Sequence, residues 1–516
     1  MPALQSTIVL CTLNAKYIHA SLGLRYLRAN MGDLAGQTTV REFTIARPAQ
    51  DLADELLALQ PAIIGFGVYI WNIVQTTELV RLLKAARPDV KIVLGGPEVS
   101  YEWEQQAIVA LADYLITGWG DTSFPKLCRA LLRGPQPLMK VMAGEQPELD
   151  VIVLPYDEYT DADLAHRLLY VEASRGCPFK CEFCLSSLDK TAKPFALDGF
   201  LAALDRLYQR GARNFKFVDR TFNLKVDASV RILEFFLERM ASDLFLHFEV
   251  IPDHLPDRLK TLIALFPAGV LQLEVGIQTF NETVQHRISR RQDNAKTEAN
   301  LAWLVQHSQA HLHTDLIFGL PGETLESFAA GFDRLYALGP HEIQLGLLKR
   351  LRGTPIARHT LEHGMVYATQ PPYTVQQTAV ADAQTVQQIT RLARYWDLVA
   401  NSGRFRQTVA VLLQGPSAFA AFWDWSDWLW RTSGKTHGLT PEHLVDALFD
   451  FLTGSRGLPT EEVRQLLLTD YMHSGAHARP DCLRDVLPRP VAPQHGARTR
   501  QLALRQDQHA RGVALP

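Results

Sequence analysis

Three of the six cysteines stand close together, at Cys177, Cys181 and Cys184, with the spacing C-x3-C-x2-C. Cysteine thiolates ligate iron–sulfur clusters, and three of them hold three irons of a [4Fe–4S] cubane while the fourth iron stays open. A zinc site is the alternative, but structural zinc takes four ligands, and the sequence places no further cysteine and no pair of histidines nearby. The spacing therefore predicts a [4Fe–4S] cluster with one open iron.

The elements around these cysteines predict how the cluster is positioned. Short apolar runs alternate with stretches of helical periodicity and predict six strands, at residues 168–173, 214–218, 245–250, 270–277, 311–318 and 342–348. Six β/α repeats of this kind indicate a partial TIM-like (β/α)6 barrel, in which the carboxyl ends of the strands carry the chemistry. The cysteines follow the first strand directly and therefore belong to that end of the barrel.

The N-terminal part of the chain carries a second alternation of strands and helices. Runs rich in Val, Ile and Leu predict strands buried on both faces, at residues 6–12, 39–46, 62–68, 90–95 and 114–117. Helical stretches separate these runs, so we expect a doubly wound, Rossmann-like parallel sheet. Ligands of such sheets bind at the carboxyl ends of the strands, and unusual loops occupy those ends, at residues 14–19, 67–72, 95–98 and 118–121.

These patterns divide the chain into segments. We expect a Rossmann-like domain, a linker, a barrel, a mostly α-helical domain and a disordered tail, at residues 1–142, 143–163, 164–363, 364–478 and 479–516 respectively. The predicted fold class is α/β with a helical C-terminal region.

The composition argues against nucleic acids and membranes as partners, because the former need a strong positive charge and the latter an apolar anchor. The 52 basic and 55 acidic residues nearly cancel, to a net charge of -3, so nucleic acid is an unlikely partner. No apolar run approaches the roughly 18 residues of a membrane span, and the first residues do not resemble a secretory leader. We therefore expect a cytoplasmic protein with no membrane partner.

The cysteine motif resembles the signature of the radical S-adenosylmethionine (SAM) superfamily. Four N-terminal segments resemble the cobalamin-binding domain of the B12-dependent members of that superfamily, at residues 14–27, 67–72, 94–100 and 117–127. Three later segments resemble a subgroup whose C-terminal domain has no assigned function, at residues 348–355, 391–397 and 401–405. The resemblance implies three cofactors, namely a [4Fe–4S] cluster, SAM and cobalamin.

In that superfamily the open iron chelates the amino and carboxylate groups of SAM, and an electron from the cluster cleaves SAM to a 5′-deoxyadenosyl radical. An electron donor such as flavodoxin or ferredoxin is therefore an implied partner. The positions that match its SAM contacts are Phe183, Asp219, Glu249, Glu274, Gln278 and Leu320. Core packing is the alternative role for Phe183, and capping of a helix is the alternative for Asp219.

The resemblance also implies a set of cobalamin contacts, at Tyr17, His19, Val68, Tyr69, Gly95, Gly96, Pro97, Glu98, Gly118 and Gly120. Many cobalamin domains supply a histidine to cobalt from an Asp-x-His-x-x-Gly string, which this sequence lacks, so we expect cobalamin without a histidine lower ligand. Trp119 and Asp121 stand where the group more often has Glu, although the glycines around them are kept. A domain that has lost its ligand is the alternative.

Together the cofactors suggest a division of labour. The adenosyl radical would abstract a hydrogen from the substrate, methylcobalamin would deliver a methyl group to the resulting carbon radical, and a second SAM would remethylate the corrin. The first hypothesis is therefore a C-methyltransferase that acts on an unactivated carbon of an unknown substrate. The alternatives are a radical rearrangement, cyclisation or epimerisation in which cobalamin transfers no methyl, and a sensor of cobalamin or of the cluster that does not turn over.

Overall fold

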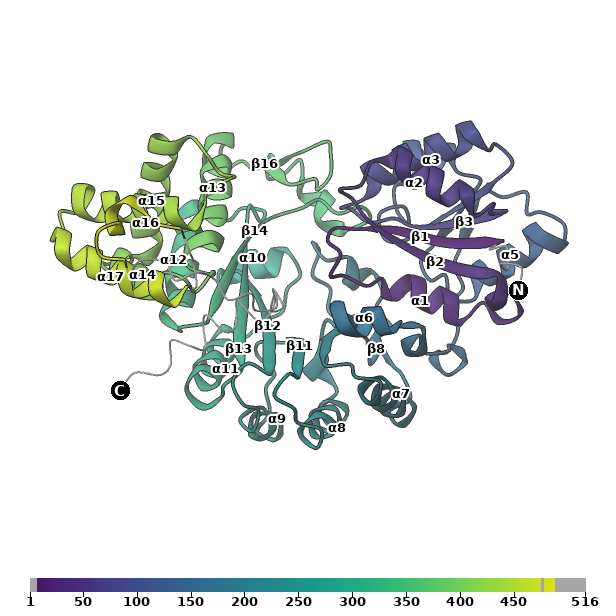
Figure 1. Cartoon of the computed structure of the whole chain (residues 1–516), viewed down its shortest axis with the longest axis horizontal. Helices are drawn as coiled ribbons and strands as arrows, with labels where there is room; N and C mark the ends of the chain where they lie inside the picture. The colour runs from purple at the N-terminus through teal and green to yellow at the C-terminus, as the bar shows by residue number, and fades with distance from the viewer. Residues whose placement is uncertain (1–6, 475–477, 488–516) are drawn as a thin grey trace. The chain divides into compact units, whose positions relative to one another are not determined.

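The computed structural model describes residues 7–474 and 478–487 and contains two six-stranded parallel sheets (Figure 1). The predicted α/β class is confirmed. The expected disordered tail at 479–516 falls mostly outside the described residues. Backbone contacts divide the chain into two compact units. The first unit has residues 7–249, Lys349–Arg358 and Tyr367–Thr374, and the second has Val250–Leu348, His359–Val366 and the described residues from 375 onward.

The first sheet has the strand order β2-β1-β3-β4-β5-β6. Its strands are β1 (Ile8–Asn14), β2 (Thr38–Thr44), β3 (Ile63–Gly67), β4 (Lys91–Gly95), β5 (Tyr114–Thr117) and β6 (Val141–Ala143). The helices between them are α1 (Leu22–Ala29), α2 (Ala49–Ala58), α3 (Ile73–Ala86), α4 (Ala107–Leu111) and α5 (Ser123–Arg133). Its neighbouring strands pair in parallel, and β1 lies between β2 and β3, as in a doubly wound sheet.

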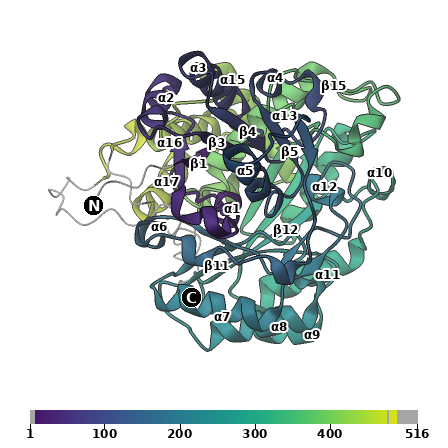
Figure 2. The same cartoon turned by 90° about the vertical axis from the view of Figure 1, so that its right-hand side faces the viewer.

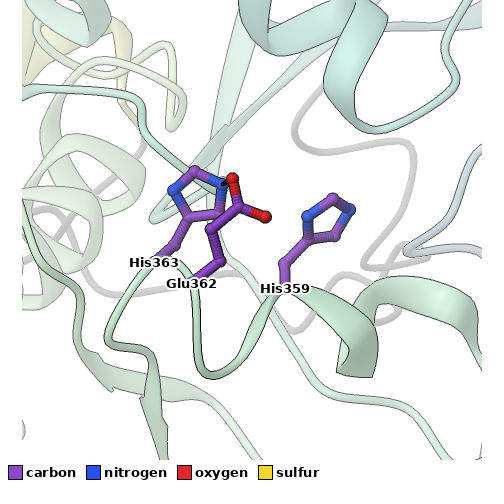
Figure 3. A group of neighbouring side chains, drawn as sticks. All are labelled: His359, Glu362 and His363. Carbon is purple, nitrogen blue, oxygen red and sulfur yellow. Dashed lines mark ion pairs between the residues drawn. The ribbon is translucent and has the colours of Figure 1, made fainter.

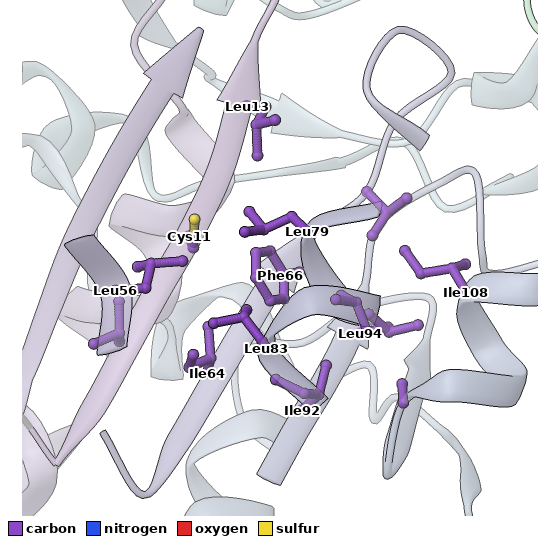
Figure 4. Packing of buried hydrophobic residues seen from close by; sticks show 14 of the residues in the cluster. Cys11, Leu13, Leu56, Ile64, Phe66, Leu79, Leu83, Ile92, Leu94 and Ile108 are labelled. Carbon is purple, nitrogen blue, oxygen red and sulfur yellow. The ribbon is translucent and has the colours of Figure 1, made fainter. Parts of the chain in front are cut away.

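Apolar side chains cover both faces of this sheet. On one face, Cys11, Phe66 and Leu94 pack against leucines of α2 and α3 (Figure 4). On the other face, Leu10 and Val93 pack against Leu24 of α1 and against the apolar side of α5. All seven residues of β1 are buried, because a strand with helices on both sides has no solvent-facing positions.

The second sheet has the order β14-β13-β12-β11-β10-β7. Its strands are β7 (Leu169–Val171), β10 (Asn214–Phe217), β11 (Phe245–Val250), β12 (Leu271–Gln278), β13 (His311–Phe318) and β14 (Glu342–Leu347). The helices that alternate with them are α7 (Leu197–Gln209), α8 (Val226–Leu237), α9 (Asp257–Ile263), α10 (Glu282–Arg287), α11 (Asn294–His307) and α12 (Leu325–Ala337). Figure 2 shows α7 and α8 side by side, as they also are in Figure 1.

Residues alternate between two environments along the strands of the second unit. In β12, Leu271, Leu273, Val275 and Ile277 are buried, while the polar residues between them are only half-buried. Strand β13 shows the same alternation from Leu312 onward. Because successive side chains point to opposite faces of a strand, the apolar series faces the helices and the polar series faces the inner side of the curved sheet.

The remaining elements complete the two units. A short helix, α6 (Asp161–His166), precedes β7. There are also two small two-stranded sheets. One is the antiparallel pair β8 (Ser174–Arg175) and β9 (Lys193–Pro194), and the other is formed by β15 (Val366–Tyr367) and β16 (Val375–Gln377). The C-terminal helices are α13 (Ala383–Val399), α14 (Arg406–Leu412), α15 (Ala418–Ser433), α16 (Pro441–Asp450) and α17 (Thr460–His473). Within the described ranges, we find no helix that is both long and apolar enough to cross a bilayer.

Candidate functional site

The three cysteines lie in a loop that directly follows β7, at the carboxyl end of the second sheet. Cys177 and Cys181 are buried and Cys184 is half-buried, and none of the three forms a disulfide. The loop is held at Cys177, whose N–H donates to the carbonyl of Asp189 over 2.8 Å. Gly176 before it has φ +83°, and a Cβ there would lie 2.8 Å from the Asp189 carbonyl oxygen, so only glycine fits.

The chemistry of this donor set fits an iron–sulfur cluster. Burial raises the pKa of Cys177 to about 11, so its thiol would not ionise at neutral pH without a cation beside it. Iron supplies that charge, because metal binding displaces the thiol proton. Three free cysteines on one short loop are therefore suited to hold the irons of a cluster, which would supply electron transfer to SAM.

Asp219 is fully engaged with the segment that leads into the cysteine loop. Its Oδ2 accepts the N–H of Ala173 over 2.9 Å, and its Oδ1 accepts the hydroxyl of Ser174 over 2.6 Å. Burial raises the pKa of Asp219 to about 7, although both hydrogen bonds oppose the shift. This carboxyl group thus joins the end of β10 to the end of β7 and helps to position the cysteines.

Glu249 is the penultimate residue of β11 and pairs with Arg220, a residue that the sequence reasoning did not select. Arg220 Nη1 lies 2.6 and 2.8 Å from the two carboxylate oxygens of Glu249. Its positive charge also acts on Cys177, lowering the pKa of that thiol, against the larger effect of burial. The only feature of the sequence that could have pointed to Arg220 is its position immediately after Asp219. Phe183 is half-buried in the cysteine loop.

Glu274, Gln278 and Leu320 belong to the second unit. Glu274 and Gln278 are half-buried on the polar side of β12, and Leu320 is fully buried after β13. Gln278 has φ +70° beside a bulge in the β12–β13 pairing. A non-glycine residue in that conformation stores strain of the kind found at binding sites.

Two contacts in the second unit hold the Gly-Leu-Pro-Gly turn that follows β13. Arg287 Nη1 donates to the carbonyl of Pro321 over 2.6 Å, and Thr279 donates its hydroxyl to Glu323. Burial raises the pKa of Glu323 to about 7. Arg287 thus holds the turn in position.

A cavity of about 280 Å³ lies at the carboxyl edge of the first sheet. Five of the ten expected cobalamin contacts line it, namely Tyr69, Gly95, Gly96, Gly118 and Gly120. Glycines at 65 and 67 line it as well, so several of the strand positions that line this space have no side chain. A cavity kept open by glycines, with backbone donors and acceptors at its edge, fits the tail of a cobalamin bound without a histidine from the protein.

The other expected cobalamin contacts are placed around this cavity in different roles. Val68 is buried against the Gly96 turn, where a Cβ on Gly96 would lie 2.5 Å from the Val68 carbonyl oxygen, and Pro97 is half-buried. His19 Nδ1 lies 2.7 Å from the Tyr170 hydroxyl, and burial followed by nearby lysines lowers the pKa of this histidine. Tyr17 is 56% exposed, with the guanidinium of Arg167 over its ring.

We predict that Gly95→Val abolishes cobalamin retention while leaving the cluster intact. A Cβ at Gly95 would be 3.7 Å from the nearest atom, the Ile116 carbonyl oxygen, so the strand accepts it, but the added methyls enter the cavity. Corrin absorbance per chain after reconstitution and gel filtration should fall at least tenfold, whereas Gly95→Ala should lose less. Equal corrin content in the wild type and Gly95→Val would place cobalamin elsewhere.

The wall of the cavity contains a buried charge cluster that the sequence reasoning missed. Arg175 makes two hydrogen bonds to Asp121, of 2.8 and 3.0 Å, and one to Glu172, of 2.8 Å. All three side chains are at least 88% buried. Arg175 lines the cavity and precedes the first cysteine by two residues, so the cavity lies beside the segment that leads into the cysteine loop.

Glu98, one of the expected cobalamin contacts, makes hydrogen bonds to two distant residues of the first unit. It is 4% exposed and accepts hydrogen bonds from Arg352 Nε over 2.9 Å and from the Tyr373 hydroxyl over 2.6 Å. Arg352 belongs to a segment of the first unit, Lys349–Arg358, which we call the strap, and Tyr373 belongs to another segment of that unit, Tyr367–Thr374. Further along the strap, Arg358 pairs with Glu182 through two hydrogen bonds, of 2.8 and 2.6 Å. Glu182 stands between Cys181 and Cys184, so the strap also holds the cysteine loop.

We predict that Arg358→Met accelerates loss of the cluster. Glu182 is only 5% exposed, so without the arginine a buried carboxylate loses its bidentate partner next to two cluster ligands. Iron release to a chelator under anaerobic conditions should be about tenfold faster, in the range known for residues that support metal ligands. Arg350→Met is the matched control, because Arg350 lies on the same strap but pairs with Glu102. Iron release from Arg358→Met at the wild-type rate would contradict a role for the strap in holding the cluster.

A second group of possible metal ligands is found in the second unit, outside the cysteine loop. The ligand atoms of His359, Glu362 and His363 lie within 4.8 Å of one another (Figure 3). Glu362 is 77% exposed, however, and burial and the charge of Arg287 lower the pKa of His363. A neighbouring guanidinium disfavours a bound cation, so we assign no metal to this group.

Three family models match successive parts of the chain. The B12 binding domain matches residues 8–128, the radical SAM superfamily matches residues 171–335, and a protein of unknown function (DUF4080) matches residues 361–508. The chain is 26% identical to the uncharacterized methyltransferase PH0819 of Pyrococcus horikoshii over 41% of its own length and 52% of that protein.

Two further similarities point the same way. The cobalamin-dependent radical SAM methyltransferase TokK of Streptomyces tokunonensis is 23% identical, over 59% of this chain and 49% of that protein. The chain thus spans about half the length of each of these two relatives. The cobalamin-dependent SAM radical enzyme OxsB, solved with aqua-cobalamin, has the same fold, with a TM-score of 0.59 at 14% identity over 90% of this chain and 80% of that chain.

The family models coincide with the parts of the molecule that carry the candidate site. The glycine-lined cavity lies in the B12-binding region, and the cysteine loop lies at the start of the radical SAM region. The chain is therefore a radical SAM protein with a B12 binding domain, and the cofactors of these two domains are a [4Fe–4S] cluster, SAM and cobalamin; its C-terminal part matches a domain of unknown function.

Proposed function

We propose that this enzyme is a C-methyltransferase that adds a methyl group to an unactivated carbon of its substrate. The cluster and SAM supply a substrate carbon radical, and cobalamin supplies the methyl group. The observation that carries the proposal is the short distance along the chain between the cavity and the cysteine loop, because Arg175 lines the cavity and stands two residues before Cys177. Two methyltransferases among the relatives support it.

Particular residues perform particular tasks in this proposal. Cys177, Cys181 and Cys184 bind the cluster, and Asp219 keeps their loop in place through Ala173 and Ser174. Phe183, Glu249, Glu274, Gln278 and Leu320 stay assigned to SAM by their positions in the motifs. Arg220 neutralises Glu249, so a SAM contact there would use a paired carboxylate.

Cobalamin binds in this proposal without a histidine from the protein. His19 lies at the end of the relevant loop, but its Nδ1 already meets the Tyr170 hydroxyl. The edge of the sheet instead offers glycine backbone at 95, 96, 118 and 120. A reductant of low potential, such as flavodoxin or ferredoxin, delivers the electrons.

The test uses SAM whose methyl group carries three deuteriums, so that no substrate has to be known. Holoenzyme reduced anaerobically should transfer the labelled methyl to its corrin, which gains the CD3 mass in extracts, and should also release 5′-deoxyadenosine. Deoxyadenosine without label on the corrin would favour the alternative, a radical rearrangement, cyclisation or epimerisation. If neither product forms, the sensor hypothesis remains.

A further inference from the structure

The cluster has to receive electrons from outside the protein. Each reductive cleavage of SAM takes one electron from the cluster, so a reduced carrier has to meet the enzyme repeatedly. Because electron transfer slows steeply with distance, the carrier has to bind at the surface next to the cluster. In the proposed function that surface is formed by the cysteine loop and by the residues packed against it, and its charges determine which carrier it attracts.

Two exposed lysines belong to this surface. Lys180 stands directly before Cys181 in the loop, and its side chain is exposed. Lys190 is also exposed, and it follows Asp189, whose carbonyl oxygen accepts the N–H of Cys177 over 2.8 Å. One lysine therefore adjoins a cysteine in the sequence, and the other adjoins a residue that is hydrogen-bonded to a cysteine.

The turn that carries Lys190 is held close to the cysteine loop. A Cβ on Gly176 would lie 2.8 Å from Thr191 Oγ1, so the turn packs directly on the backbone before the first cysteine. Asp189 Oδ1 accepts the N–H and the hydroxyl of Thr191, over 3.1 and 2.7 Å, and Asp189 Oδ2 accepts the Nε1–H of Trp119 over 3.0 Å. These contacts fix the backbone on both sides of Lys190 and do not involve its own side chain.

The charges of these segments are arranged with the cations outward. Glu182 is only 5% exposed and is paired with Arg358, whose side chain is 62% exposed. Asp189 is half-buried, and its carboxylate already accepts three hydrogen bonds. Neither Lys180 nor Lys190 has an ion pair with any residue in the described ranges. The loop therefore presents a positive surface, although the net charge of the chain is -3.

A small positive surface suits a brief encounter with an acidic partner. Complexes that transfer electrons between proteins are typically weak and bury less than about 1,200 Å². Opposite charges on the two partners raise the association rate and orient them, while they add less to the affinity. Within the described part of the chain, Lys180 and Lys190 have no ion pair to lose when a partner arrives, so each is available to a carboxylate of that partner.

We propose that Lys180, Lys190 and Arg358 form the docking surface for an acidic electron-carrier protein. Carboxylates of the carrier lie against these cations and hold its redox centre over the cysteine loop. The carrier is oxidised by one electron, and that electron passes to the cluster. This role rests on the proposed function for the position of the cluster, and it adds the surface through which the electrons arrive.

The first test is binding, with oxidised flavodoxin as the acidic probe. Holoenzyme loaded with cluster, cobalamin and SAM should bind it saturably at an ionic strength of about 0.01 M, where charges act over about 30 Å. Lys180→Glu and Lys190→Glu should each weaken binding about tenfold, because each reverses a charge on the docking surface. Carbodiimide should cross-link flavodoxin carboxylates to Lys180 or Lys190. Lys435→Glu is the matched control, since Lys435 is an exposed lysine of the second unit without an ion pair among the described residues.

The second test separates docking from damage to the cluster. Release of 5′-deoxyadenosine driven by reduced flavodoxin should slow about tenfold in the two lysine variants. Release driven by reduced methyl viologen, a small cation that needs no docking surface, should stay close to that of the wild type. No release with methyl viologen in the wild type would overturn the position of the cluster and the docking surface together. Failure of the wild type to bind flavodoxin, wild-type binding in both lysine variants, or an equal loss in Lys435→Glu would overturn the docking surface alone.

Discussion

Replacing Cys181 by serine should abolish the cleavage of SAM. In the proposed function the three cysteines of the loop bind three irons, and a hydroxyl does not replace a thiolate as a ligand of an iron–sulfur cluster. The iron content after anaerobic reconstitution should fall from about four per chain to less than one. Release of 5′-deoxyadenosine should fall at least a thousandfold, to the level of a sample without protein.

The control for this variant is Cys482→Ser. Cys482 is also a free, half-buried thiol, but it lies in the second unit beside Asp446. Its replacement should leave iron content and deoxyadenosine release within twofold of the wild type. Full iron content in Cys181→Ser would contradict the assignment of the cluster to this loop, and equal losses in both variants would indicate general damage by oxidation or misfolding.

Replacing Arg175 by methionine should have the largest effect on stability. Methionine keeps much of the apolar stem of the side chain, but Asp121 and Glu172 would remain as buried carboxylates without their cation. Removing one partner from a buried ion pair typically costs about 3–5 kcal/mol. The ring contacts of the guanidinium with Tyr26 and Trp119 would be lost as well. The urea midpoint of the first unit should fall markedly.

A combined variant separates the charge from the packing. In Arg175→Met with Asp121→Asn and Glu172→Gln, no buried charge is left unpaired, so most of the lost stability should return. Burial already raises the pKa of Glu172, which indicates how costly this carboxylate is when its partner is removed. If the triple variant is as unstable as Arg175→Met, the arginine stabilises the wall through packing with the aromatic rings and not through charge.

Strands with strong local patterns could be predicted from the sequence. The seven residues of β1 form an almost continuous apolar run, and β13 was placed at residues 311–318, as the structure has it. The short edge strand β6 was missed, because three half-exposed or exposed residues give no recognisable period. The pair β15 and β16 was missed for the same reason.

The cysteines could be identified because their spacing along the chain is itself the signature. Contacts between distant residues leave no such pattern. Glu98 was assigned to cobalamin from its place in a loop, but its hydrogen-bond partner Arg352 is 254 positions away in sequence. Arg175 likewise gains its role only where the fold brings Asp121 beside it, 54 positions away. The expected SAM and cobalamin contacts all remain predictions, including the five that line the cavity.

The central claim is most directly tested by one spectroscopic and chemical measurement on the same sample. Protein reconstituted anaerobically with iron, sulfide and hydroxocobalamin is reduced, given SAM and assayed for bound corrin, iron and 5′-deoxyadenosine. We predict about four irons and one corrin per chain, together with deoxyadenosine that requires the reductant. A sample that holds corrin but neither binds iron at the cysteine loop nor cleaves SAM would contradict the account.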